Sequence, residues 1–184
     1  MRRLRPLLAA LCCAVLGSAG AQTIDKLQPA GKDGIYEWYD GGQVRRVVID
    51  PAHVAEFGQR LESASTPVAK ANGVRIWRRD DSAAARAGAE GNASPVFRSA
   101  DGGGMRALPG NVIVKLDPSW HAGQVASWLS ANGLREVRRL PLGGNVLVVA
   151  SPPGLESLAL ANRLQQSGSV VSAQPDWWEQ TEAR

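Results

Sequence analysis

Short apolar runs, separated by stretches with helical periodicity, dominate the second half of the chain. Residues 112–116 (Val-Ile-Val-Lys-Leu) and 145–150 (Asn-Val-Leu-Val-Val-Ala) are almost continuously apolar, which is typical of strands covered on both faces. Residues 135–139 carry three arginines and a glutamate, and this charge indicates an edge strand that resists pairing with other chains. A further strand is expected to begin at Val170 and Val171.

Two helices are predicted between these strands. The first follows residues 117–119, with Asp117 or Ser119 as its N-cap, and the second follows residues 152–154 and ends at Gly168. The resulting order is strand, helix, strand, strand, helix, strand, with the two apolar strands in the centre. This order predicts a ferredoxin-like βαββαβ domain.

The first half of the chain is predicted to be mostly β-structure. Residues 35–40 and 44–50 have the pattern of two strands joined by a tight turn at Gly41-Gly42. Apolar residues then recur at helical spacing, so a short helix is expected from Asp50-Pro51 to Leu61.

The fold class is therefore α+β, and the chain divides into five parts. Residues 78–91 contain no large apolar side chain, which is typical of a linker. The parts are a signal peptide (1–21), a mobile arm (22–34), a small β-rich unit with one short helix (35–77), a flexible linker (78–93) and the ferredoxin-like domain (94–184).

The first residues have the pattern of a secretory leader. Three arginines precede an apolar run over residues 7–16, and small residues follow up to Ala21, where we expect cleavage. The apolar run is too short to span a bilayer, which argues against a stable membrane anchor. The mature protein is therefore expected in the periplasm or secreted.

Removal of this leader changes the charge and the cysteine content. The formal charge of +4 loses three arginines and no acidic residue, which leaves +1 and argues against nucleic-acid binding. Cys12 and Cys13 leave with the leader, so we expect neither a disulfide nor a thiol nucleophile.

Candidate catalytic chemistry is sparse. The chain contains only two histidines, His53 and His121, and His121 is expected at the surface near a helix start. Acidic residues and histidines do not occur at metal-ligand spacing, and Gly102-Gly103-Gly104 lacks the Lys-Ser/Thr of a phosphate loop. We therefore expect no catalysis, no cofactor and no metal.

The central strand 145–150 presents apolar side chains to both faces of its sheet. Both helices of a βαββαβ domain lie on one face, so the other face needs a cover. We expect Leu147 and Val149 to lie on that other face, where either the first unit or a second protein covers them.

Three segments carry a resemblance to a known family. They are Gly110-Asn-Val-Ile-Val-Lys-Leu-Asp-Pro118, Ala131-Asn-Gly-Leu134 and Ala173-Gln-Pro-Asp-Trp177. In this order they resemble the N-terminal propeptide of exported subtilisin-like serine proteases. The catalytic domain is not part of this sequence, because an Asp, His and Ser triad has no counterpart here.

The resemblance implies a mode of action. Such a propeptide packs the open face of its sheet on two surface helices of the protease and places its C-terminal tail in the active-site cleft. It acts as a folding chaperone and as a temporary inhibitor. The residues expected to bind the protease are, in the tail, Pro175, Asp176, Trp177, Trp178, Glu179 and Arg184, and, on the sheet, Leu147 and Val149.

Three functions remain open at this point. The first is a stand-alone inhibitor or folding chaperone of a subtilisin-like serine protease. The second is a non-catalytic periplasmic binding or structural module, and the third is the remnant of a protease that lost its catalytic domain. In the second case the first unit is expected to cover Leu147 and Val149. In either case an alternative role of Trp177 and Trp178 is to cover the edge of the core, and this role is compatible with partner binding by one of the two rings.

Overall fold

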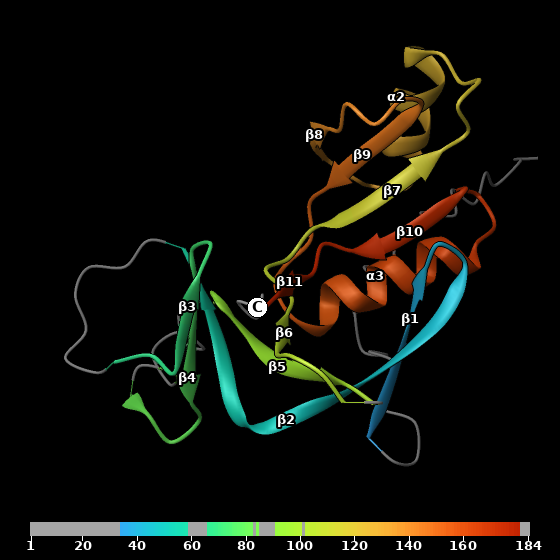
Figure 1. Cartoon of the computed structure of the whole chain (residues 1–184). Helices are drawn as coiled ribbons and strands as arrows, with labels where there is room; N and C mark the ends of the chain where they lie inside the picture. Colours follow the sequence, from blue (N-terminus) through green and yellow to red (C-terminus); the bar gives the residue numbers. More distant parts are fainter. Residues whose placement is uncertain (1–33, 59–65, 83, 85–90, 101, 181–184) are drawn as a thin grey trace, which may run out of the picture.

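The computed structural model describes residues 34–58, 66–82, 84, 91–100 and 102–180. The described residues form a mixed α/β structure, mostly strands in two antiparallel sheets with two helices, which confirms the mixed class (Figure 1). Several predictions concern residues outside these ranges, namely the signal peptide (1–21), most of the arm (22–34), part of the linker (78–93), Leu61 and Arg184.

The first sheet has seven strands. Six of them follow the order β11-β6-β5-β2-β4-β3, and the seventh, β1, pairs with β2. The strands are β1 (Ile35–Asp40), β2 (Gln43–Phe57), β3 (Ala69–Ala71), β4 (Val74–Arg78), β5 (Ala93–Ser99), β6 (Arg106–Ala107) and β11 (Trp178–Glu179). Every pairing in it is antiparallel. β5 and β6, placed by sequence partly in the linker and partly in the C-terminal domain, thus belong to the first sheet.

The second sheet has four antiparallel strands in the order β10-β7-β9-β8. They are β7 (Val112–Leu116), β8 (Glu136–Arg139), β9 (Asn145–Val149) and β10 (Ser172–Pro175), and the helices are α2 (Ala122–Ala131) and α3 (Leu155–Gln166). The two apolar strands β7 and β9 are the inner strands, and the charged strand β8 lies at an edge, in agreement with their sequence patterns.

The helix predicted after Asp50 is wrong, because β2 continues as a strand through Phe57. The register between β2 and β5 shifts between Asp50 and Val54, so an irregularity interrupts the two-residue alternation there. Asp50 Oδ1 accepts a hydrogen bond from the Ala52 N–H over 2.9 Å. The side chain thus stabilises the irregular turn of the strand instead of capping a helix.

The N-cap of α2 is His121, not Asp117 or Ser119 as predicted. His121 Nδ1 accepts from the Gln124 N–H over 3.3 Å, and Gln124 Oε1 accepts from the His121 N–H over 3.0 Å, which forms a capping box. Asp117 Oδ1 instead accepts from the Ser119 N–H and the Ser119 hydroxyl. Asp117 therefore stabilises the turn that precedes the helix.

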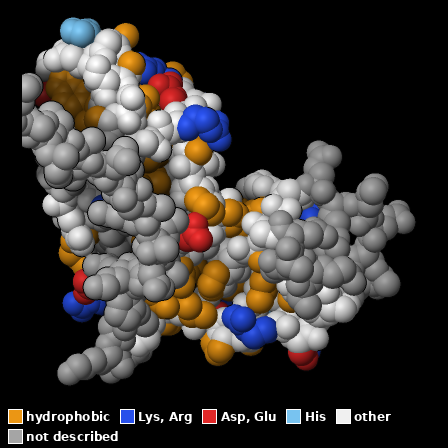
Figure 2. All heavy atoms as spheres, turned by 180° about the vertical axis from the view of Figure 1, so that it is seen from behind, with side chains coloured by type: hydrophobic (Ala, Val, Ile, Leu, Met, Phe, Trp, Pro, Cys, Tyr) orange, Lys and Arg blue, Asp and Glu red, His pale blue; other side chains and the backbone are white. Residues whose placement is uncertain are grey.

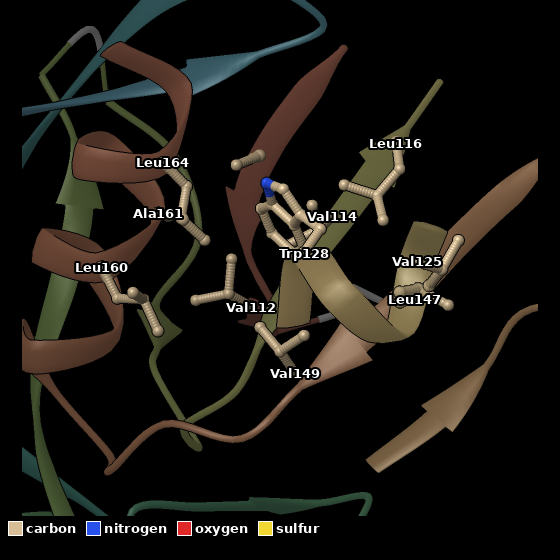
Figure 3. Packing of buried hydrophobic residues seen from close by; sticks show 11 residues of the cluster. Val112, Val114, Leu116, Val125, Trp128, Leu147, Val149, Leu160, Ala161 and Leu164 are labelled. Carbon is tan, nitrogen blue, oxygen red and sulfur yellow. The ribbon is translucent and has the colours of Figure 1, made fainter. Parts of the chain in front are cut away.

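The second sheet and its helices enclose one hydrophobic core. Val112, Val114, Leu116, Leu147, Val149 and Ala173 from the strands pack against Val125 and Trp128 of α2 and Leu160, Ala161 and Leu164 of α3. The Trp128 ring projects from α2 into the middle of this cluster, toward the side chains of both α3 and β7 (Figure 3). Both helices consequently lie on the same face of the sheet.

The opposite side of α3 packs against the first sheet. Leu158 joins a second cluster with Trp38, Val47, Phe97 and Leu108, and Leu155 lies against it. The helix is therefore shared by both sheets, with Leu160, Ala161 and Leu164 turned toward one and Leu155 and Leu158 toward the other. Seen from behind, hydrophobic side chains gather in the region between the β3–β4 end of the molecule and the part that carries the helices (Figure 2).

Candidate partner-binding site

The predicted tail residues follow β10 directly and continue into the first sheet. Pro175 is buried and pairs with Val112 at the end of β10. The Asp176 N–H donates to the carbonyl oxygen of Asn111 over 3.4 Å. The chain then crosses from the second sheet to the first within two residues.

Asp176 lies at this crossing with its carboxylate partly buried. Burial raises the pKa of this carboxyl above its ordinary value, and the positive charge of Arg138 partly opposes the rise. The Arg138 guanidinium is 3.9 Å from Asp176 Oδ2, at the outer limit of an ion pair. The charged form of Asp176 is therefore only weakly compensated.

Trp177 packs against the aromatic side chains of the first sheet. Its ring centroid is 5.4 Å from that of Trp38 and 5.4 Å from that of Phe97, in edge-on arrangements. It lies beside the same cluster that receives Leu158 of α3. This ring thus helps to join the tail to the core between the sheets.

Trp178 is a core residue of the first sheet. Only 6% of its surface is exposed, and its indole N–H donates to the Ala71 carbonyl oxygen over 3.2 Å. Glu179 is paired with Arg106 over 3.3 Å, and the Gln180 N–H donates to the Met105 carbonyl oxygen over 2.9 Å. The two tryptophans therefore cover the core edge, which is the alternative role expected for them from the sequence.

Leu147 and Val149 do not lie on a partner-facing surface. Both are fully buried under α2 and α3, whose side chains form one cluster with them. The prediction that Leu147 and Val149 face away from the helices is therefore wrong. Because β9 is apolar on both faces, its sequence does not indicate which face the helices cover. Val146 and Val148 point to the face away from the helices.

The helix-free face combines apolar and basic side chains. Val148 pairs with Ile113 of β7 and Val146 with Lys115, while Arg138 lies opposite Val148 on β8. Val146 and Val148 are buried, and neither belongs to the hydrophobic clusters of the described residues. Ile113 is partly exposed, and Lys115 and Arg138 are exposed. We refer to these five residues as the helix-free face.

Two polar clusters in the first sheet escaped the sequence analysis. Glu56 is buried and accepts from Arg75 Nε over 2.9 Å and from the Trp77 indole N–H over 2.7 Å. Since Glu56 lies opposite Arg75 on β4, correct strand assignment of residues 54–57 would have revealed the pair. The erroneous helix concealed it.

The second cluster surrounds Asp50 at the irregular turn of β2. Asp50 Oδ2 is 3.0 Å from His53 Nδ1 and accepts from Arg98 Nε over 2.9 Å. Burial alone raises the pKa of Asp50, but the hydrogen bonds from the Ala52 N–H, His53 and Arg98 together outweigh it and hold the pKa below its ordinary value. Both histidines of the chain thus have structural partners, His53 in this cluster and His121 at the start of α2.

Within the described residues, groups of three or more His, Cys, Asp or Glu side chains that could hold a metal ion are absent. Among the same residues, the helices fall short of the length and apolarity needed to cross a membrane. Comparison of the chain with protein-family models, with curated proteins and with solved structures found no match.

Proposed function

We propose that this chain is a ferredoxin-like, non-catalytic binding module that is exported and acts as an inhibitor or folding chaperone of a subtilisin-like serine protease. The order β10-β7-β9-β8 and the position of both helices on one face support the ferredoxin-like assignment. The observation that carries the proposed function is the helix-free face of the second sheet.

The composition of the helix-free face suits a protein surface with acidic edges. Ile113 supplies a partly exposed apolar side chain beside the buried Val146 and Val148, while Lys115 and Arg138 supply exposed positive charge around it. Protein interfaces commonly combine an apolar centre with a charged rim that orients the partner. We propose that this face contacts surface helices of the protease.

The C-terminal tail can bind a protease cleft only after it is released from the first sheet. Residues 176–180 are held in the first sheet by the burial of Trp178 and the hydrogen bond from the Gln180 N–H. Insertion of this segment into an active-site cleft as an added strand requires these contacts to break first. The helix-free face is therefore the better supported half of the proposed interface.

The anchored tail favours a second candidate function, a binding or structural module without a protease partner. In that case β11 and the two tryptophans serve only to close the fold. A protease remnant would share the same anchored tail. Binding experiments separate the first function from these two.

The proposed function is tested by adding the mature protein to a panel of purified subtilisin-like proteases and measuring peptide hydrolysis and the yield of refolded enzyme. We expect slower hydrolysis or a higher refolding yield with at least one protease. The double variant Lys115→Glu/Arg138→Glu should reduce the effect about tenfold or more, since reversed rim charges repel an acidic partner. Lys70→Glu, an exposed charge reversal on β3, is the matched control and should behave like the wild type.

Absence of both inhibition and refolding assistance across the panel would refute the proposed function. Equal losses in the Lys70→Glu control and the double variant would refute the assignment of the interface to the helix-free face.

A further inference from the structure

A cavity of about 590 Å³ opens on the first sheet near the turn between β1 and β2. Its lining includes Arg45 and Arg46 of β2, Arg106 of β6, and Trp38, Asp40 and Ser99. Arg45 lies on the same face of the sheet as Trp38, its cross-strand partner, whereas the Arg46 side chain points to the other face, toward Glu37. The helix-free face belongs to the other sheet, so this cavity is separate from the proposed protease interface.

The arginines of the cavity have acidic partners that hold them weakly. Arg45 is 3.5 Å from Asp40, Arg46 is 3.0 Å from Glu37, and Arg106 is 3.3 Å from Glu179. In each pair at least one side chain is about half exposed. Such exposed pairs contribute little to stability, so a competing anion can replace the protein carboxylate at low cost.

Trp38 provides a fixed wall beside two of these arginines. The Arg106 Cζ atom lies 6.0 Å from the centroid of the Trp38 ring, within range of a cation–π contact. Arg45 is the cross-strand partner of Trp38 in the β1–β2 pair. Because Trp38 is buried and packs against Trp177, its ring constrains where the Arg106 guanidinium can lie.

We propose that this cavity binds a small solute that carries an oxyanion, either a phosphate or a carboxylate group. Arg45 and Arg106 would donate paired N–H groups to its oxygens, and the Ser99 hydroxyl would add a further donor. The planar guanidinium fork matches both kinds of oxyanion.

Occupation of the cavity also affects the C-terminal strand. Glu179 of β11 and the ligand compete for Arg106, since the same guanidinium serves both. Ligand binding should therefore shift the NMR signals of Glu179 as well as those of the arginines. Binding to an unrelated surface site would leave Glu179 unchanged.

The test is a pair of titrations of the mature protein, one with inorganic phosphate and one with citrate, at constant ionic strength adjusted with chloride. We expect saturable shifts of the Trp38 and Arg106 side-chain NMR signals, with a Kd below about 10 mM for at least one of the two anions. A response to phosphate alone assigns the site to phosphate groups, and a response to citrate alone assigns it to carboxylates.

Three variants and a control define the site. Arg45→Gln and Arg106→Gln should each weaken binding about fivefold or more, and Arg106→Lys should retain part of the affinity because the charge remains. Arg139→Gln is the matched control, since Arg139 is 45% exposed and paired with Glu136, much as Arg45 is 54% exposed and paired with Asp40. Thermal unfolding of each variant verifies that it is folded.

The proposal is overturned by shifts that fail to saturate with both anions. It is also overturned if Arg139→Gln weakens binding as much as the cavity variants do. Loss of protease inhibition leaves it intact, because the titrations measure anion binding without a protease.

Discussion

The side-chain amide of Asn162 in α3 donates a hydrogen bond to the backbone carbonyl oxygen of Glu37 in β1, and the two atoms are 2.7 Å apart. Asn162 is 5% exposed, so this bond lies in the core between the helix and the first sheet. It joins positions 125 residues apart in the sequence. Because a hydrogen bond is directional and apolar packing is not, this contact helps to fix the orientation of the first sheet relative to α3.

Asn162→Ala should lower the free energy of unfolding by about 0.5–1.5 kcal/mol, because it removes the buried donor of this hydrogen bond. Urea denaturation followed by tryptophan fluorescence measures the change. Asn132→Ala is the control: Asn132 donates to the Trp128 carbonyl oxygen over 2.8 Å but is exposed at the end of α2. The interpretation fails if the exposed variant costs as much as the buried one.

Glu56→Ala should lower the free energy of unfolding by about 2–4 kcal/mol, because it leaves the partly buried Arg75 charge and the buried Trp77 indole N–H without their shared acceptor. Glu56→Gln should cost less, since its amide oxygen still accepts one of the two hydrogen bonds. The same denaturation experiment on Glu136→Ala, which breaks the exposed pair with Arg139, should show a loss within about 1 kcal/mol. A Glu56→Ala protein as stable as the wild type would contradict this account.

Asp50 should make the protein sensitive to acid. Its pKa is lower in the folded protein than in the unfolded chain, so its stabilising contribution is present above the unfolded pKa and is lost as the pH falls through the folded pKa. We expect the free energy of unfolding of the wild type to fall more steeply than that of Asp50→Asn between about pH 5 and pH 2. Parallel pH profiles for the two proteins would show that the Asp50 cluster has no such role.

Asp176 should have the opposite effect. Burial raises the pKa of Asp176 in the folded protein above its value in the unfolded chain. The free energy of unfolding therefore begins to fall as the pH rises through the unfolded pKa. It reaches its full loss above the folded pKa, where Asp176 is charged in both states. Asp176→Asn should therefore raise the free energy of unfolding near pH 7, and the gain should vanish in acid. Arg138→Gln should lower stability near pH 7, because it removes the charge that opposes the rise of this pKa.

Trp178→Ala should lower the free energy of unfolding by about 3–5 kcal/mol, because it empties a buried site in the first sheet and removes the hydrogen bond to Ala71. Trp178→Phe should retain much of the packing and cost less. Glu179→Gln, at the exposed neighbouring residue, should change the stability by less than about 1 kcal/mol. A small effect of Trp178→Ala would mean that β11 is readily released, which would favour a tail that can enter a protease cleft.

The secondary structure of the second sheet could be predicted from sequence because its strands and helices follow unbroken patterns. β7 and β9 are continuous apolar runs, and β8 carries the charge of an edge. The strand β2 could not be predicted in full, because the irregularity between Asp50 and Val54 interrupts its alternation. The apolar residues after it then fall at helical spacing by coincidence.

The candidate site was harder to predict than the fold. The sequence of β9 indicates a buried strand but does not say that Leu147 and Val149, and not Val146 and Val148, face the helices. That choice depends on the whole packing arrangement of α2 and α3. The Arg106 contribution to the cavity was equally hidden, since it depends on a two-residue strand pairing with segments far away in the sequence.

The two-sided packing of α3 has a consequence for how the molecule unfolds. Removal of either sheet would expose Leu158 on one side of this helix or Ala161 and Leu164 on the other. The first sheet thus depends on Leu158 and Trp178 from the second half of the chain, and the second half exposes Leu155 and Leu158 when the first sheet is absent. Heat and denaturant should melt both sheets in one cooperative transition, and an N-terminal fragment that ends between β6 and β7 should remain unfolded until the C-terminal fragment is added.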